Sequence, residues 1–427
     1  MLRVVVFLLA FGFGPGWAHA GTLEDCNQSA NHDRQISGCT KLIRQGRLSR
    51  KNLAIAYFNR GRAHAKKSQY DRAIADLTQA IKLNPKDDKA YNNRGIAYKK
   101  KADYRRAIAD YDKAIKLNPR GHLTYVNRGN VYSDKGNYDR AIADYTQAIK
   151  LNPKFAEAYN IRSRAYLMKG QYDRAIADYD MVIKLNPKDD TAYTSRASAY
   201  DNKGDFERAI ADYAKAISLN RRNTIALNGR ANAYYDKGKH TRASMDYSLA
   251  ILELGRSAGF TALNNRKPSD KDSAFFAKVL VNRGDNYQKL SDYSSAIRDY
   301  DEAIKLKPKY KRAYNNRALA HEKAGQREKA IADFRKIIEL KPGDKVATNG
   351  LKRLVATPKK EANPKKPSVT LKTGSNNALS KEMDLTFWNS IRNSDDPAML
   401  QAYLNQFPEG TFAALAKIKL GKLKKAQ

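Results

Sequence analysis

The strongest constraint in this sequence is a segment that recurs every 34 residues. YRRAIADYDKAIKLNP (104–119), YDRAIADYTQAIKLNP (138–153) and YDRAIADYDMVIKLNP (172–187) are copies of one pattern at that spacing. Each copy follows a segment with small and apolar residues at helical spacing, such as AYNNRGIAYKK (90–100). One repeat is therefore two helices joined by a turn, and the Asn-Pro pair ends the second helix. A fixed period of this length predicts an all-α fold, a solenoid of stacked helical hairpins.

Eight such repeats cover nearly two thirds of the chain. Six follow one another in phase from 54 to 257, and two more run from 277 to 344. With each repeat numbered from 1, position 8 always carries a small residue and position 20 is always alanine. Small side chains fit there because the two helices of a hairpin approach each other most closely at these positions. Tyrosines recur at positions 11 and 24, for example Tyr98 and Tyr111, and we expect them to supply the apolar bulk between the helices.

These repeats resemble tetratricopeptide repeats. The resemblance implies a right-handed superhelix in which the first helices of the hairpins line a concave groove. It also implies that the activity is binding, with an extended or helical segment of another protein in that groove. The basic pairs with which some members of the family hold a C-terminal carboxylate do not occur here in the required pattern.

Position 7 departs from the family pattern, because an apolar core residue is usual there and this chain has arginine in all eight repeats. Position 23 is aspartate in all eight. We expect a ladder of partly buried ion pairs within or between hairpins, since a planar guanidinium can make two parallel hydrogen bonds to a carboxylate. The alternative is that the arginines form a row that binds a ligand. The pairs are Arg60 and Asp76, Arg94 and Asp110, Arg128 and Asp144, Arg162 and Asp178, Arg196 and Asp212, Arg230 and Asp246, Arg283 and Asp299, and Arg317 and Asp333.

Asparagine recurs at position 6 of five repeats. Carboxamides can donate to and accept from a peptide backbone without reading its side chains, so this row predicts a peptide-binding site in the groove. Descent from one duplicated repeat explains the same row equally well. The five residues are Asn59, Asn93, Asn127, Asn282 and Asn316.

The only two cysteines, Cys26 and Cys39, fit the same numbering. DRQISGCTKLI (33–43) aligns with DRAIADYTQAI, which places Cys39 at position 24 and Cys26 at position 11 of a partial repeat. Cysteines thus occupy the two facing tyrosine positions of a hairpin, and we expect a disulfide that closes this partial repeat, residues 21–50. A link across a loop of this length stabilises by about 3 kcal/mol. A catalytic or metal-binding pair is the alternative, but no C-x-x-C or histidine pair at ligand spacing accompanies the cysteines.

The first 20 residues have the features of a secretory signal peptide, with Arg3, an apolar run and the ending Ala18-His19-Ala20. We therefore expect an exported protein, periplasmic or secreted, in an oxidising compartment that permits the disulfide. The chain carries 80 Lys and Arg against 44 Asp and Glu, a formal net charge of +36. Export makes nucleic acid an unexpected partner. Acidic polysaccharide or anionic lipid surfaces, bound by a basic edge of the repeats, are then the alternative to a protein partner.

The remaining segments interrupt or follow the repeats. Nineteen extra residues, 258–276, separate repeats six and seven. We expect part of them to lengthen the flanking helices and NNRKPSDKD (264–272) to form a mobile loop, which is either a hinge or an ordinary surface loop. After repeat eight, 345–356 is predicted to be a capping helix and 357–383 a flexible basic linker. The end of the chain, 384–427, contains F-W-x-S-I and Y-L-x-x-F-P-x-G, and it resembles the short helical module at the ends of various bacterial repeat and caspase-like proteins. We expect its aromatic residues to form a small core.

The sequence contains no pattern typical of catalysis or metal binding. No phosphate-binding glycine loop, H-E-x-x-H sequence or nucleophile elbow occurs, and the six histidines have no partners at metal-ligand spacing. We therefore expect no enzymatic activity, no cofactor and no metal. The sequence predicts an exported scaffold or adaptor that binds a protein or peptide partner in the groove of its repeats. The alternative is a basic envelope-associated protein that binds acidic polysaccharide or anionic lipid through its Lys- and Arg-rich edge.

Overall fold

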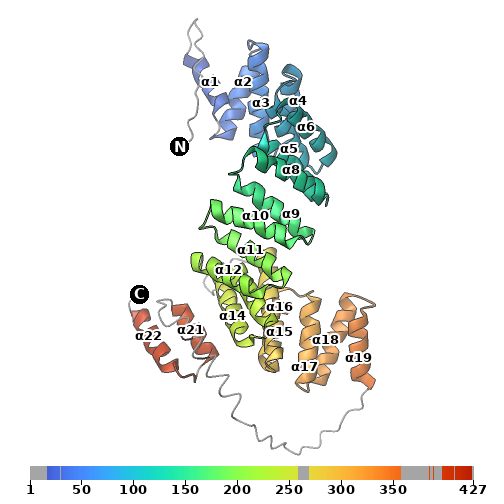
Figure 1. Cartoon of the computed structure of the whole chain (residues 1–427), viewed down its shortest axis with the longest axis vertical. Coiled ribbons are helices and arrows are strands. Elements are labelled where there is room, and N and C mark those ends of the chain that lie inside the picture. The colour runs from blue at the N-terminus through green and yellow to red at the C-terminus, as the bar shows by residue number, and fades with distance from the viewer. Residues whose placement is uncertain are drawn as a thin grey trace, which may run out of the picture. The chain divides into compact units, whose positions relative to one another are not determined.

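The structure, a computed structural model, consists of helical hairpins that follow one another along the chain (Figure 1). It divides into two compact units, residues 1–187 and 188–427. No strand occurs in the part of the chain that the structure describes. The described residues are 17–28, 30–257, 269–356, 384, 388, 397–407 and 409–425.

The first unit contains five hairpins in chain order, and each odd-numbered helix is the first helix of its hairpin (Figure 1). Each helix packs against the next, so the second helix of one hairpin also contacts the first helix of the following one. The helices are α1 (Trp17–Asn27), α2 (His32–Arg44), α3 (Arg50–Lys66), α4 (Tyr70–Leu83), α5 (Asp88–Lys100), α6 (Tyr104–Leu117), α7 (His122–Asp134), α8 (Tyr138–Leu151), α9 (Ala156–Met168) and α10 (Tyr172–Leu185).

The second unit continues the same pattern with four hairpins, a single helix at the predicted position of the cap, and the helices of the C-terminal module. The predicted all-α solenoid of helical hairpins is thereby confirmed. The helices are α11 (Asp190–Lys203), α12 (Phe206–Leu219), α13 (Thr224–Asp236), α14 (His240–Ser257), α15 (Asp270–Lys289), α16 (Tyr293–Leu306), α17 (Lys311–Lys323), α18 (Arg327–Leu340), α19 (Lys345–Ala356), α21 (Pro397–Gln406) and α22 (Ala413–Lys425). None of the described helices is long and apolar enough to cross a membrane.

The small residue at position 8 is required because the aromatic ring at position 24 fills the space beside it. A Cβ atom added at Gly95 would lie 2.7 Å from Cε1 of Tyr111, and one added at Gly129 would lie 2.6 Å from Cε1 of Tyr145. Both rings are fully buried. The predicted role of the tyrosines at position 24 as core residues is therefore confirmed.

Proline is not needed to end the second helix of a repeat. Repeats five and six have Arg221 and Gly255 where the other six repeats have proline. Helix α12 of repeat five still ends at Leu219, the position at which the second helices of the proline-containing repeats end, whereas α14 of repeat six runs on to Ser257. The amide of Asn220 donates to Asp190 at 3.0 Å, and in repeat two Asn118 bonds to Asp88 in the same way at 2.9 Å. The asparagine before the proline therefore fixes the turn between repeats by a side-chain hydrogen bond.

The partial repeat at the N-terminus contains the predicted disulfide. Cys26 on α1 and Cys39 on α2 are bonded with their Cα atoms 4.5 Å apart, and both side chains are buried. They lie in a small core with Leu42 and Ala56, where tyrosines pack in other hairpins. The part of the predicted signal peptide before Trp17 lies outside the described residues.

The insertion between repeats six and seven lengthens a flanking helix, as predicted, but the predicted loop extends too far toward repeat seven. Helix α15 begins at Asp270, so its first two turns belong to the segment predicted as an insertion, 258–276, and lengthen the first helix of repeat seven. The predicted loop was too long at this end because Ser269 caps the helix, with its hydroxyl accepting from the backbone N–H of Asp272 at 3.2 Å. The preceding residues, 258–268, and the predicted linker, 357–383, lie outside the described residues.

The aromatic core predicted for the C-terminal module is confirmed. Trp388 and Phe412 stack with ring centroids 5.4 Å apart, and Tyr403 is fully buried between α21 and α22. The Tyr403 hydroxyl and the backbone N–H of Thr411 both donate to the buried carboxylate of Asp384. Part of this core is therefore polar and fully hydrogen-bonded, which the sequence did not indicate.

Candidate functional site

All eight predicted arginine–aspartate pairs form, and each lies within one hairpin. Arg128 is typical, since its Nε donates to Asp144 Oδ2 at 2.9 Å and its Nη2 donates to Oδ1 at 2.6 Å. The aspartates are buried, and the hydrogen bonds to Asp144 raise the pKa of Arg128 above its ordinary value. The bidentate hydrogen bonds in the eight pairs span 2.5–2.9 Å.

Most of these arginines also join neighbouring hairpins, through a hydrogen bond to the residue at position 25 of the preceding repeat. Arg128 Nη1 donates to Asp112 at 2.6 Å, and Arg162 Nη1 donates to Thr146 at 2.9 Å. This contact of position 25 was not predicted, although a hydroxyl or carboxyl residue recurs there in most repeats. The ladder therefore acts both within and between hairpins. Its guanidinium groups are bonded to the chain itself, which argues against the alternative of a ligand-binding arginine row.

The predicted asparagine row lies on the first helices, but its amides mostly bond to neighbouring residues of the chain. Asn127 donates to Asn92 at 3.0 Å, joining α7 to α5. Asn282 is a correction to the predicted site, because its side chain is buried and its amide bonds to Asn228 and Asn232 on α13, both at 3.3 Å. The others are half-buried: Asn59 donates to Asn27 at 3.2 Å, Asn93 to the backbone of Lys89 at 2.8 Å and Asn316 to Asp285 at 2.6 Å.

One pocket of the first unit opens among the first helices α3, α5 and α7. We call it the Phe58 pocket, and its cavity volume is about 470 Å³. It brings Asn93 of the predicted row beside apolar and basic side chains. Its lining residues are Phe58, Arg62, Asp88, Lys89, Asn92, Asn93, Gly121, His122, Leu123 and Thr124.

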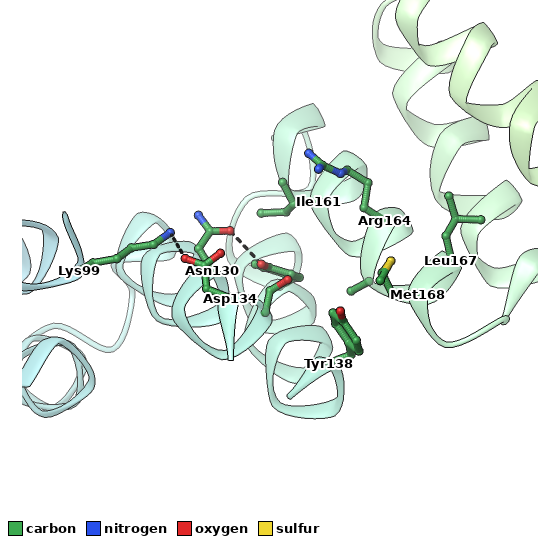
Figure 2. Close-up of a pocket in the computed structure, with 11 residues that line it drawn as sticks. Lys99, Asn130, Asp134, Tyr138, Ile161, Arg164, Leu167 and Met168 are labelled. Carbon is green, nitrogen blue, oxygen red and sulfur yellow. Dashed lines mark hydrogen bonds and ion pairs between the residues drawn. The ribbon is translucent and has the colours of Figure 1, made fainter. Parts of the chain in front are cut away.

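A second pocket of the first unit, the Met168 pocket, has a volume of about 410 Å³ and is lined mainly by α7, α8 and α9 (Figure 2). Lys99 and Asp134, paired at 3.1 Å, lie at one end, and Tyr138 and Met168 lie at the other (Figure 2). The Tyr145 hydroxyl donates to Asn130 at 2.8 Å, which holds the amide against the pocket wall. The full lining is Lys99, Asn130, Ser133, Asp134, Tyr138, Tyr145, Ile161, Arg164, Ala165, Leu167 and Met168.

The Met168 pocket was not predicted, although the residue at position 13 of repeat four distinguishes that repeat in the sequence. Met168 is 66% exposed at position 13, where repeats two and three have the polar residues Lys100 and Asp134. An exposed apolar residue at a position that is otherwise polar indicates a surface with a use other than solvation. Arg164, four residues earlier, is also exposed, and no ion pair to it forms among the described residues.

Helix α11, a first helix of the second unit, carries a carboxylate with a raised pKa, that of Asp201. Burial, together with the nearby Asp236 carboxylate, raises the pKa of Asp201 to about 6. One carboxylate oxygen of Asp201 is buried and accepts no hydrogen bond within the described structure. Asp201 is therefore a carboxylate whose charged form the fold disfavours.

The described residues contain no group of three or more His, Cys, Asp or Glu side chains that could hold a metal ion. His64 and His321, at the tyrosine position 11, bond through Nδ1 to Gln69 and Gln326, both at 2.7 Å. These two histidines are thus held by hydrogen bonds inside their own hairpins.

Comparison with known families gives several matches over the repeats. One family model described as "Tetratricopeptide repeat" matches residues 126–190 and 281–345. A second model with the same description matches residues 88–120 and 191–223. A model described as "TPR repeat" matches 61–102. A search of curated proteins found no match.

Many solved structures are similar to this chain. A tetratricopeptide repeat protein from Parabacteroides merdae is 18% identical, with a TM-score of 0.47 over 63% of this chain and 98% of that one. The C-terminal part of a TPR repeat-containing protein from Cytophaga hutchinsonii is 19% identical, with a TM-score of 0.45 over 69% and 99%. YrrB, a TPR protein described as having an unusual peptide-binding site, is 23% identical, with a TM-score of 0.38 over 44% and 95%.

Proposed function

Because the chain belongs to the tetratricopeptide repeat family, we propose that it is a non-enzymatic exported scaffold that binds a protein or peptide partner along the first helices of its repeats. Proteins built from such repeats generally serve as interaction scaffolds. The proposal concerns the location of the binding surface, the export of the chain and the absence of catalysis.

The observation that carries the proposal is the pair of pockets in the first unit. The Phe58 pocket is lined by residues from three successive first helices, and the Met168 pocket by residues from the three first helices α5, α7 and α9 and from α8. A segment that occupies such pockets contacts several repeats at once. Repetition of one small unit can thus build an extended binding surface, which a single hairpin is too small to provide.

Export is supported by two features at the N-terminus. The first 20 residues have the composition of a signal peptide. Disulfides form and persist in oxidising compartments, and Cys26 and Cys39 form one between α1 and α2. Both features fit a periplasmic or secreted scaffold.

The test is capture of a partner from an envelope extract by the immobilised mature chain, at low and at high salt. Phe58→Ala and Met168→Ala each shorten a pocket-lining side chain, and Leu185→Ala removes an exposed apolar side chain at the end of a second helix. We expect a partner that is retained at high salt, lost with the two pocket variants and kept with the Leu185 variant. A captured species that is released by salt and unaffected by the pocket variants would instead support binding of acidic polymers through the basic surface.

A further inference from the structure

Resting on the proposed function, we propose that the partner segment is an acidic peptide in an extended conformation that carries two apolar side chains. One of these occupies the Phe58 pocket and the other occupies the Met168 pocket. Carboxylates of the same segment pair with the cations beside the pockets. The proposal thus assigns a partner chemistry to the binding surface of the first unit.

The apolar anchors follow from apolar side chains that the fold leaves exposed at both pockets. At the Phe58 pocket, Leu123 is 53% exposed, and it lines the cavity with Phe58. At the Met168 pocket, Met168 is 66% exposed beside Leu167 and Ile161. Methionine is unbranched and adapts to the shape of an apolar partner, so it suits a surface that accepts an inserted side chain.

The acidic character follows from the cations beside the pockets. Arg62 and Lys89 at the Phe58 pocket and Arg164 at the Met168 pocket are exposed, and no ion pair to them forms among the described residues. They are available to carboxylates of a partner and would repel a basic segment.

The carboxylates that line the same pockets already have partners within the chain. Asp88 accepts from Asn118 at 2.9 Å, and Asp134 pairs with Lys99 at 3.1 Å. Each pocket also carries two basic side chains against its one carboxylate, Arg62 and Lys89 at the Phe58 pocket and Lys99 and Arg164 at the Met168 pocket, so the net charge offered to a partner at both pockets is positive. This complementarity selects an acidic segment over a neutral or basic one.

The spacing of the anchors follows from helix geometry. Leu123 and Asn130 line different pockets and lie seven residues apart on α7, which is about 10 Å along the helix axis. The pockets are also displaced by about one helix spacing, 8–10 Å, across the stack. The diagonal is therefore about 14 Å, which an extended chain spans in about four residues.

The test uses a fluorescein-labelled synthetic peptide of glutamates with two leucines about four residues apart. Two control peptides carry lysines in place of the glutamates, or alanines in place of the leucines. Fluorescence anisotropy at physiological ionic strength measures the binding of each peptide to the mature chain. We expect saturable binding of the acidic leucine peptide, and binding at least about tenfold weaker for both controls.

The variants separate the pockets from general charge attraction. Arg164→Glu and Arg62→Glu reverse cations at the two pockets, and Arg72→Glu makes the same change on the exposed surface of α4, a second helix. We expect each pocket variant to weaken binding by at least about tenfold and the Arg72 variant by less than about twofold. Far-UV circular dichroism establishes that each variant is folded.

Three results would overturn the proposal: no binding of the acidic leucine peptide, equal binding of the lysine peptide, or equal weakening by Arg72→Glu and the pocket variants. If one of these occurs while capture from envelope extract still depends on Phe58 and Met168, the scaffold function stands and only the partner chemistry is wrong. If that capture is also independent of the pockets, both proposals fail.

Discussion

The arginine–aspartate ladder allows a quantitative test at Arg128, in the middle of the first unit. Arg128 makes two hydrogen bonds to Asp144 and one to Asp112, at 2.9, 2.6 and 2.6 Å. Replacing Arg128 by methionine keeps much of the side-chain volume but removes all three bonds. Asp144, which is only 5% exposed, is then left as a buried carboxylate without its cation.

The expected magnitude follows from this geometry. Breaking a buried ion pair by removing one partner costs about 3–5 kcal/mol, because the remaining charge stays desolvated. The double variant Arg128→Met, Asp144→Leu removes both charges and fills the space with apolar atoms, so we expect it to differ from the parent by less than about 1–2 kcal/mol. The double variant should therefore be more stable than Arg128→Met alone.

Urea denaturation followed by circular dichroism gives the free energies for a double-mutant cycle. Hydrogen exchange of α7 and α8 shows whether the loss of stability lies in the affected hairpin. We expect a coupling energy of at least about 2 kcal/mol between Arg128 and Asp144. If the changes in free energy caused by the two single substitutions add up to the change in the double variant, Arg128 and Asp144 are not energetically linked. That result would refute the ladder as a source of specificity.

The pair of Arg230 and Asp246 in the second unit is a control for the pair of Arg128 and Asp144. It separates the hydrogen bonds that the arginine makes within its hairpin from the bond that it makes to the preceding hairpin. Arg230 bonds to Asp246 at 2.7 Å with both nitrogens, but position 25 of the preceding repeat is Ala214, whose side chain offers no acceptor. The third bond of Arg128 is to Asp112, which is half exposed, so it is worth at most about 1 kcal/mol. Arg128→Met should therefore cost no more than about 1 kcal/mol beyond Arg230→Met.

Three further predictions concern the disulfide, a turn and a buried carboxylate. Changing Cys26 and Cys39 to serine should destabilise the first hairpin by about 3 kcal/mol and speed hydrogen exchange in α1 and α2 while α6 to α8 stay protected. Ala102 has a φ of 58°, so Ala102→Gly should raise the free energy of unfolding measured by urea denaturation, whereas Gly136→Ala, at a φ of 73° with open space around it, should lower that free energy by about 1 kcal/mol. The pKa of Asp201 is raised to about 6 in the folded chain. The protonated carboxyl therefore contributes stability that is fully present below pH 3.8 and is lost as the pH rises through about 6. Calorimetry should therefore show a smaller fall in Tm between pH 4 and 7 for Asp201→Asn than for the parent chain, and equal falls would contradict the raised pKa.

The 34-residue period and the residues that recur at fixed positions of the repeat made most of the fold predictable. A 34-residue period fixed the order of helices, and the numbering that it provides placed Cys26 opposite Cys39 in the position of two core tyrosines. It also paired position 7 with position 23, because arginine and aspartate occur together in every repeat. Such regularities are visible in one sequence because each repeat acts as an independent copy of the same structure.

The binding surface was less predictable, because it depends on how hairpins stack and not on the repeat pattern. Asn282 has the same position as Asn93, yet it is buried by the amides of Asn228 and Asn232 in the neighbouring repeat. The sequence shows that asparagine recurs at this position, but the side chains of the neighbouring repeat decide whether each asparagine is exposed. Met168, in contrast, breaks the pattern of its position and lines a pocket. The residues that define the surface are therefore partly those in which the repeats differ.

The ladder and the proposed binding surface are physically connected through the helices that they share. Arg128 lies on α7, which contributes residues to both pockets, and Arg162 lies on α9, which contributes Arg164 and Met168. Each arginine bonds to its own hairpin and to the hairpin before it, so the distance between α7 and α9 is set in part by these bonds. An apolar residue at position 7 could pack against any neighbour of similar shape, but a bidentate pair with a third directed bond accepts one register. The ladder therefore holds neighbouring first helices in the alignment on which a two-pocket surface depends, even though none of its arginines lines either pocket.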